Sequence, residues 1–185
     1  MSNTTKQNKK RTLFRSVQSM TVAAMLAAMS VVIGIFCKNL LNFGGGLFRI
    51  TFENFPIILS GIMFGPVIGC LVGIASDLIS YLLSAQVYPP NLIVTAGAAA
   101  VGLISGIMSR YVVRKKGMLT IIISGGLAHI VGSMIIKPIG LFAFYGWAVL
   151  WRIPLYLLIA PTEILIMCLL NRRASFRRLL EQVIG

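Results

Sequence analysis

Acidic residues are scarce in this chain: only 4 of its 185 residues are Asp or Glu, and charged residues of both signs make up 11%. A soluble domain carries about 25% charged residues. Hydrophobic residues make up 57% of the chain, and its mean hydropathy is +0.90. The composition therefore excludes an ordinary soluble domain and indicates an integral membrane protein with one compact domain.

The sequence also lacks the motifs of common catalytic and metal sites. It has one histidine, and its three cysteines, Cys37, Cys70 and Cys168, form no C-x-x-C pair, which argues against a zinc site or a disulfide framework. No G-x-x-x-x-G-K-[ST] loop is present, so we expect no ATP hydrolysis by this chain itself. We expect no enzyme, no bound metal and no cofactor, and active transport would need a partner that supplies energy.

Long apolar runs dominate what is present. A membrane-spanning helix needs about 20 apolar residues, and the runs predict spans at 17–36, 50–64, 67–83, 92–113, 119–136 and 153–170, joined by loops at 37–49, 65–66, 84–91 and 137–149. We expect an all-α bundle of six transmembrane helices over 17–171, with basic segments at 1–16 and 172–185. The first span follows a long basic lead and has about 20 apolar residues, whereas a cleaved signal peptide would have a shorter apolar core and a small-residue cleavage site beyond it, so we expect the span to be retained.

The positions of the basic residues predict the orientation. The net charge is +13, and if both termini are cytoplasmic, all but four of the 17 basic residues fall on the cytoplasmic side. They bracket apolar spans and form no basic face on a soluble fold, which argues against nucleic acid as a partner. The four exceptions, at the outer ends of the expected helices, are Lys38, Arg49, Lys137 and Arg152.

Polar residues inside the expected spans are candidates for function because charge is costly in lipid. Glu53 lies twelve residues before Gly65 and Asp77 twelve after it, so we expect the two carboxylates at similar depth on adjacent helices. Arg49, one helical turn before Glu53, can reach either carboxylate. It is either an ion-pair partner that ties two helices together or a ligand contact, and the sequence leaves both open.

Other polar residues carry similar alternatives. His129 and Glu163 are candidates for an interhelical hydrogen bond, which in membranes is worth about 0.6 kcal/mol, and Lys38 for snorkelling at a helix end. Lys137 and Arg152 flank a segment that holds Phe142, Phe144, Tyr145 and Trp147. That segment is either an interfacial aromatic belt or, together with the cations, part of a pocket for a flat anionic molecule.

The first expected span carries two pairs of small residues with four-residue spacing, Ala23/Ala27 and Ala24/Ala28. Such pairs let two helices approach closely. They serve either packing within the bundle or docking of another membrane protein.

Taken together, these features resemble a known family. The run "FRITFENFPIILSGIMFGPVIGCLVGIASDLISYLL", the loop "YPPN" and the paired alanines are similar to the substrate-binding S components of energy-coupling factor (ECF) vitamin transporters, most of all to the folate-specific group. The resemblance covers the chain after about residue 14. It implies a bacterial cell-membrane protein that captures a vitamin from outside and docks through Ala23, Ala24, Ala27 and Ala28 onto a transmembrane T component coupled to two cytosolic ATPases.

Folate suits the polar residues found above. Its two tail carboxylates would favour cations, and its flat pterin presents N–H donors and faces for stacking. We expect Lys137, Arg152 and Arg49 to bind the tail, and Asp77 or Glu53, with Asn91, to bind the pterin edge. The stacking residues are expected to be Tyr88, Phe144, Tyr145 and Trp147.

Three alternatives stay open. The chain can be an S component for another small molecule, such as a deazaguanine, thiamine or riboflavin, although a neutral or cationic ligand would not need four outer cations. An autonomous secondary carrier or channel would be expected to show internal repeats, and none is convincing here. An intramembrane enzyme would need a catalytic constellation that the sequence lacks.

Overall fold

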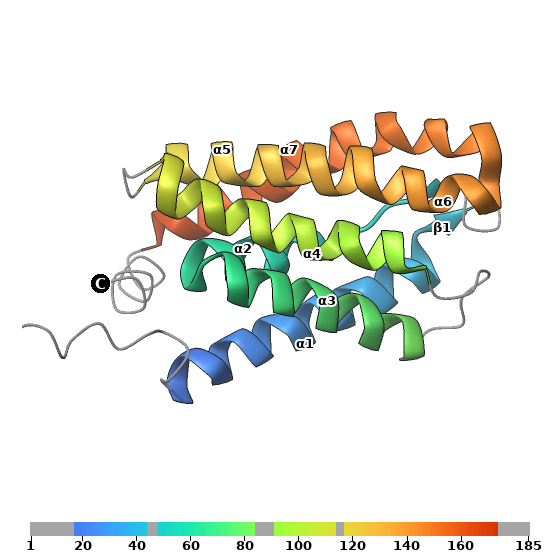
Figure 1. Ribbon diagram of the computed structural model, residues 1–185. Coiled ribbons are helices and arrows are strands. Elements are labelled where there is room, and N and C mark those ends of the chain that lie inside the picture. Colours follow the sequence, from blue (N-terminus) through green and yellow to red (C-terminus); the bar gives the residue numbers. More distant parts are fainter. Residues whose placement is uncertain (1–16, 44–47, 84–90, 114–116, 174–185) are drawn as a thin grey trace, which may run out of the picture.

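The computed structural model describes residues 17–43, 48–83, 91–113 and 117–173, and they are nearly all helical (Figure 1). The first half contains helix α1 (Val17–Leu40), the two-residue strands β1 (Asn42–Phe43) and β2 (Phe48–Arg49), and helices α2 (Asn54–Phe64), α3 (Pro66–Leu83) and α4 (Leu92–Ile107), which continues as the π-helix η3 (Met108–Val112). The second half contains α5 (Met118–Ala128), the π-helix η4 (His129–Ile136), α6 (Lys137–Tyr145), the 3₁₀ segment η5 (Gly146–Trp151) and α7 (Arg152–Arg172).

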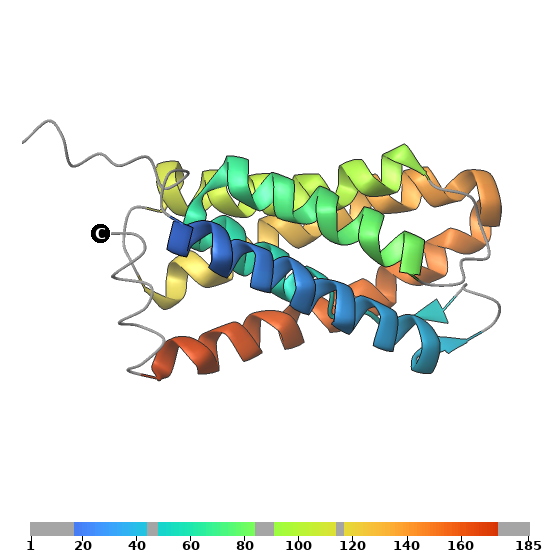
Figure 2. The same ribbon diagram turned by 90° about the horizontal axis from the view of Figure 1, so that it is seen from below.

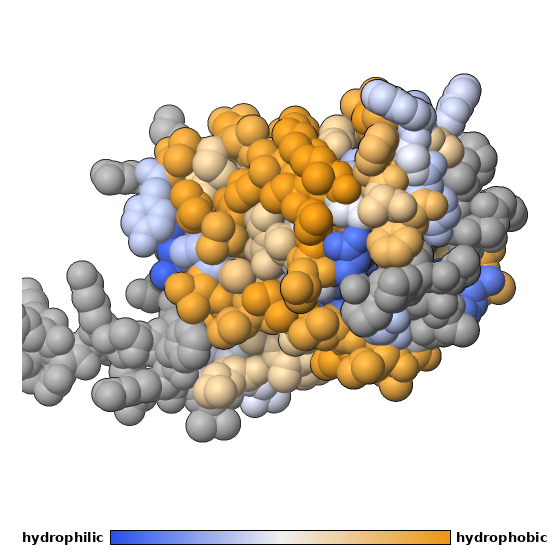
Figure 3. Space-filling model, turned by 45° about the vertical axis from the view of Figure 1, so that its right-hand side comes forward, coloured by the Kyte–Doolittle hydropathy of each residue, from blue (hydrophilic) through white to orange (hydrophobic). Residues whose placement is uncertain are grey.

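Four helical stretches are long and apolar enough to cross a membrane: 19–40, 66–83, 92–112 and 118–172. The last contains the reversal of the chain at η5, after which α7 runs back along α5 and η4 (Figure 1). Large hydrophobic side chains such as Leu82, Leu119 and Leu158 are exposed on these helices, and hydrophobic residues cover the middle of the face shown in Figure 3. The chain is therefore a helical membrane protein, while the count of six spans stays a prediction.

Helix α2 is the central element of the bundle. It has 11 residues, and every one of them is buried. A helix that is hydrophobic all round is expected in the interior, and α2 is contacted by α1, α3, α4, α5 and α7. Its central position brings the residues at its first turn against both halves of the chain.

Glycines allow the helices around α2 to approach closely. Gly65 adopts φ +92, a conformation that favours glycine, and makes the expected tight turn into α3. A Cβ on Gly102 of α4 would lie 2.0 Å from the carbonyl oxygen of Gly69 on α3, so no larger residue fits at this crossing without a shift of the backbone.

The structure corrects the sequence prediction in two segments. The expected helix from residue 50 begins only at Asn54, because β2 pairs antiparallel with β1 up to Arg49 and the amide of Ile50 then donates to the carbonyl oxygen of Leu41 at 3.2 Å. Arg49 therefore lies in a strand and not one helical turn from Glu53. The expected loop at 137–149 is largely helix, since Pro138 falls in the first turn of α6, where proline is tolerated.

The two ends of the bundle differ. The start of α1 and the end of α7 lie at one end, and β1, β2 and α6 lie at the other, which we call the pocket end (Figures 1 and 2). Arg110 is close to the turn between α2 and α3, where it donates to the carbonyl oxygen of Phe64 at 2.8 Å.

Candidate functional site

A pocket lies where α1, α3, α4, α6 and α7 meet the segment before α2. It encloses about 580 Å³ of empty space, its open mouth included. Its wall combines cations, carboxylates, hydroxyls and a few apolar side chains: Lys38, Thr51, Glu53, Asp77, Leu78, Tyr81, Asn91, Val94, Thr95, Lys137, Leu141, Arg152 and Tyr156.

Lys137 is a buried cation of the pocket wall. It is only 4% exposed, and its Nζ lies 3.2 Å from Glu53 Oε1 and donates to Asn54 Oδ1 at 3.0 Å. Glu53 is fixed in turn, because its main-chain carbonyl accepts the Ser30 hydroxyl at 2.7 Å and its amide donates to Thr51 Oγ1 at 3.3 Å. The ion pair thus joins the start of α2 to α6, and it keeps one positive and one negative group side by side in the wall.

Asp77 and Asn91 are held by different partners on the α3–α4 side. Asp77 Oδ2 accepts the Thr95 hydroxyl at 2.7 Å, which orients the carboxylate. Asn91 caps α4 by accepting the amide of Ile93 at 2.9 Å, and its side-chain NH₂ donates to the carbonyl oxygen of Gly140 on α6. Asn91 is therefore placed by its structural role as N-cap, and both residues line the pocket.

Arg152 supplies a second buried cation, at 4% exposed. Its guanidinium carbon lies 5.0 Å from the centre of the Tyr145 ring, a cation–π geometry that fixes both groups. Tyr145 thus meets the pocket through Arg152, while the Tyr156 ring forms part of the wall itself. A guanidinium in this position can bind a carboxylate with two parallel hydrogen bonds.

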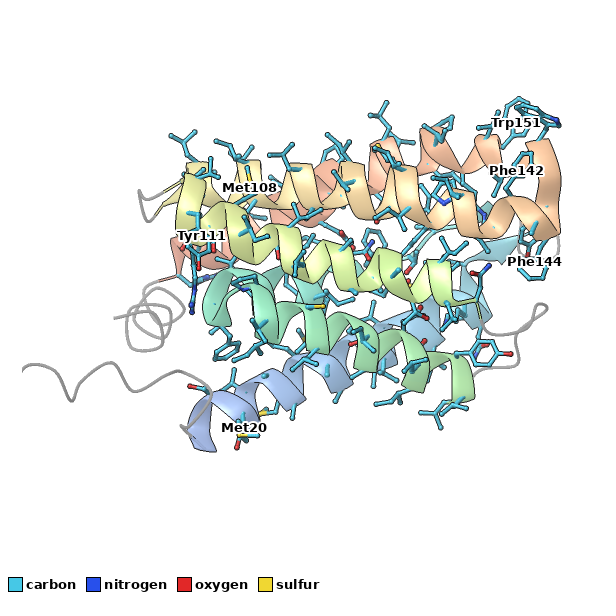
Figure 4. The ribbon with its side chains drawn as sticks, viewed as in Figure 1. Met20, Met108, Tyr111, Phe142, Phe144 and Trp151 are labelled. Carbon is cyan, nitrogen blue, oxygen red and sulfur yellow. The ribbon has the colours of Figure 1, made fainter. Side chains whose placement is uncertain are left out.

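The other aromatic residues expected to stack on a ligand lie differently. Phe144 is 43% and Trp147 76% exposed, and neither lines the pocket. Trp147 packs edge-to-face on Phe142, with ring centres 5.5 Å apart. These rings lie at the pocket end, where Figure 4 labels Phe142, Phe144 and Trp151, as an aromatic belt would.

Two expected site residues cannot be placed. Tyr88 lies outside the described residues, and for Arg49 only the main chain in β2 is described. Neither expectation is tested, and both stay predictions.

Several wall residues were not among the expected ligand contacts. Lys38 was assigned to snorkelling, but it lines the pocket and donates to Ser80 Oγ. Tyr81 lies four residues after Asp77 on α3, and this spacing places the two side chains on one face of the helix. No sequence pattern marked Thr95 or Tyr156 as pocket residues, because single hydroxyl groups are common in apolar helices and show no characteristic spacing.

A second pair of polar side chains lies in the interior of the bundle, outside the pocket wall. His129 on η4 and Glu163 on α7 are 1% and 0% exposed, with Nε2 and Oε2 3.6 Å apart. The expected proximity of the two side chains is thus confirmed, although the distance exceeds that of a hydrogen bond.

The paired alanines of α1 divide between two faces. Ala23 is buried at 8% exposed and Ala27 is half-buried, whereas Ala24 and Ala28 are exposed. Packing within the bundle therefore uses the first pair, and the second pair lies on the outer face.

With this geometry described, the comparisons decide the family. The model of the family "ECF transporter, substrate-specific component" matches residues 18–174. The chain belongs to this family. This S component is therefore a substrate-binding part of a transporter, as the resemblance implied.

Among solved structures, the S component is similar to FolT, described in a crystal structure bound with folic acid. The TM-score is 0.65 at 21% identity, and the match covers 86% of this chain and 95% of FolT, which shows a shared fold. Among curated proteins, it is 30% identical over 102 residues to the uncharacterized protein MG098 homolog of Mycoplasma pneumoniae. That match covers 50% of the S component and 20% of the relative, so the chain spans about a fifth of the relative's length.

Proposed function

We propose that this S component binds folic acid or a related folate in the pocket and delivers it to an ATP-driven ECF transporter. The observation that carries the proposal is the mixture of charges in the wall, with three cations (Lys38, Lys137 and Arg152) and two carboxylates (Glu53 and Asp77). Folate carries two carboxylates on its tail and N–H donors on its pterin. The fold shared with the folic acid-bound FolT supports the same ligand.

The residues divide into two proposed roles. Arg152 and Lys137 bind the tail carboxylates, with Arg49 as a third cation. Asp77, assisted by Asn91, accepts N–H donors of the pterin edge, because its Oδ2 is already oriented by Thr95. Tyr145, with Tyr88, is proposed to provide stacking surfaces, whereas the expected stacking by Phe144 and Trp147 is not proposed again, because neither lines the pocket.

We propose that Glu53 forms the ion pair with Lys137 and does not bind the pterin directly. Its carboxylate lies 3.2 Å from Lys137 Nζ. A ligand carboxylate at Lys137 then competes with Glu53 for the same ammonium group.

We further propose six spans within 17–171, with the basic segments 1–16 and 172–185 on the cytoplasmic side of a bacterial cell membrane. The pocket end then faces outward, because all but four of the 17 basic residues belong to segments on the opposite, cytoplasmic side. The energising partners are a transmembrane T component and two cytosolic ATPases. Ala24 and Ala28 are the proposed docking residues, since they lie on the exposed face of α1.

The direct test is to identify any molecule that copurifies with the detergent-solubilised protein and to measure binding of radiolabelled folic acid. Loss of one charge-assisted hydrogen bond costs about 1.5–3 kcal/mol, so Arg152→Ala is expected to weaken binding roughly 10- to 100-fold. Lys137→Ala is expected to weaken it less, because Glu53 already occupies part of the ammonium group.

Arg173→Ala is the matched control, since this exposed arginine lies at the end of α7 remote from the pocket wall. Its affinity for folic acid should equal that of the wild type. Copurification of a different vitamin or a deazaguanine, with no binding of folic acid, would contradict folate as the ligand while leaving the family unchanged.

A further inference from the structure

The buried His129–Glu163 pair has no part in the proposed binding of folate. Within the described part of the chain, His129 Nε2 and both carboxyl oxygens of Glu163 are buried without a hydrogen-bond partner. Buried polar atoms in native proteins are nearly always paired, so each such group needs an explanation. Three of them within one pair, in the interior of a membrane bundle, indicate a specific chemical role.

The neighbours of His129 indicate which of its two ring nitrogens carries the proton. The Lys137 ammonium can only donate, so the atom of Asn54 that it contacts at 3.0 Å is the amide oxygen. The NH₂ group of Asn54 then faces Ser133 Oγ at 3.2 Å and His129 Nδ1 at 3.5 Å. Since NH₂ can only donate, Nδ1 carries no proton. His129 is therefore a neutral imidazole with its proton on Nε2, on the side of Glu163.

A neutral His129 leaves the charge of Glu163 uncompensated by its nearest neighbour. The main-chain amides of Asn54 and Phe55, at the first turn of α2, interact with the carboxyl group and favour its negative charge, although neither reaches either oxygen with full hydrogen-bond geometry. Burial of an unpaired carboxylate costs far more free energy than the interaction of a carboxylate with a helix N-terminus contributes. A proton on Glu163 would remove this cost.

The charged groups around the pair all belong to the pocket side. Glu53 at the start of α2 and Lys137 at the start of α6 both act electrostatically on Glu163. Helix α7 itself carries Arg152 and Tyr156, and the Tyr156 ring lies edge-to-face with His129, with ring centres 6.4 Å apart. Among the described residues, α4 and α5 present only uncharged side chains to the pair. Any change in charge at Lys137 is thus felt at Glu163, through space and through Asn54.

Both helices of the pair are irregular at this point. His129 is the first residue of the π-helix η4, and Pro161 interrupts the hydrogen bonding of α7 two residues before Glu163. π-helical segments are rare and often lie at functional sites. The backbone thus departs from regular geometry on both sides of the two side chains.

We infer that Glu163 and His129 form a buried proton-binding site, coupled through Asn54 to the Lys137–Glu53 ion pair in the pocket wall. The proton comes from solvent and forms an O–H bond on Glu163, and no electron is transferred. A ligand carboxylate at Lys137 adds negative charge and favours protonation of Glu163, so at a pH where Glu163 is partly ionised the binding of an anionic ligand takes up protons. Only this last consequence rests on the proposed binding of folate.

The proton site is tested by infrared spectroscopy of the purified full chain without ligand. We expect a carbonyl band of a protonated carboxyl group at neutral pH in the wild type and in Asp77→Asn, and no such band in Glu163→Gln. In Lys137→Met the band should persist to a more alkaline pH. Methionine removes the positive charge of Lys137, and the negative charge of Glu53 remains close to Glu163.

Should a variant fail to fold, labelling of glutamate in the wild type with a heavy carbon isotope tests whether the band comes from a glutamate. A shift of the band on labelling supports the assignment to a glutamate, and absence of the band, or its retention in Glu163→Gln, overturns the proton site. An unchanged titration in folded Lys137→Met overturns the coupling. Failure of folic acid to bind counts against the proposed function alone, because the infrared measurements need no ligand.

Discussion

Asp77 offers the sharpest test of recognition at the scale of one residue. Its carboxylate lines the pocket, with Oδ2 held by Thr95 at 2.7 Å. Asp77→Asn keeps the shape but turns one acceptor into an NH₂ donor, which would face the N–H donors of a pterin. A hydrogen bond to a charged group is worth about 1.5–3 kcal/mol, so the dissociation constant for folic acid, measured by calorimetry, should rise roughly 10- to 100-fold.

Thr95→Val is the matched comparison for Asp77→Asn. Valine has nearly the same shape as threonine, and it removes only the hydroxyl that orients the carboxylate. We expect a smaller rise in the dissociation constant than for Asp77→Asn, and little further effect in the double variant. An affinity that is unchanged in Asp77→Asn would remove this carboxylate from the proposed site.

Asn54 tests the buried polar network by a different measurement. It accepts from Lys137 and donates to Ser133, with its own side chain fully buried. Asn54→Leu has similar volume but leaves these groups unsatisfied, each at about 1–3 kcal/mol. The melting temperature of the purified protein should fall clearly, while Asn91→Leu, at a half-exposed cap, should lower it less. Equal melting temperatures would contradict a central role of Asn54 in stability.

The sequence located the site better by charge than by aromatic character. Lys137, Arg152 and Asp77 line the pocket as their cost in lipid suggested, because a polar group in a membrane bundle is placed facing the interior. Phe144 and Trp147 do not line it, since aromatic residues serve interfaces and pockets equally well. The partner of Glu53 was not predictable either, because 84 residues separate it from Lys137.

At the scale of the element, the crossing of α3 and α4 is the most demanding contact. A Cβ on Gly102 would lie 2.0 Å from the carbonyl oxygen of Gly69, and a Cβ on Gly73 2.3 Å from that of Ala98. Gly102→Ala must therefore separate two backbones, at a cost of about 1–3 kcal/mol for overpacking. We expect a lower melting temperature and a smaller monodisperse fraction on size-exclusion chromatography.

Gly126→Ala serves as the control for the crossing. A Cβ there meets nothing within 4 Å, and alanine has the higher helix propensity. Its melting temperature should equal or exceed that of the wild type. A normal melting temperature in Gly102→Ala would show that the two helices separate at little cost.

The helices themselves were largely predictable, because long apolar runs leave few alternatives in a membrane. The errors fall at segment boundaries. Residues 50–53 were predicted as helix although they follow the paired strand β2, and residues 137–145 were predicted as part of a loop although they form α6. In both places tertiary contacts at the pocket end decide the local structure, and no local pattern contains them.

At the scale of the whole molecule, capture of ligand and delivery to partners should be separable. Ala24 and Ala28 are exposed on α1, away from the pocket wall. Ala24→Leu with Ala28→Leu adds bulk to a face that requires close approach of another helix. We expect affinity for folic acid to stay within about twofold of wild type, a difference of under 1 kcal/mol, while uptake by cells that express all subunits falls at least tenfold.

Ala96→Leu provides the control for this separation, because Ala96 is exposed on α4, on a different helix from the proposed docking face. Uptake should be unaffected there if added bulk on a lipid-facing helix is tolerated in general. Copurification of the tagged S component with the T component should decline in parallel with uptake only in the α1 variant. If that variant binds folate, assembles and transports normally, another face of the bundle must carry the docking, and α1 would owe its small residues to packing against α3 through Ala23 and Ala27 alone.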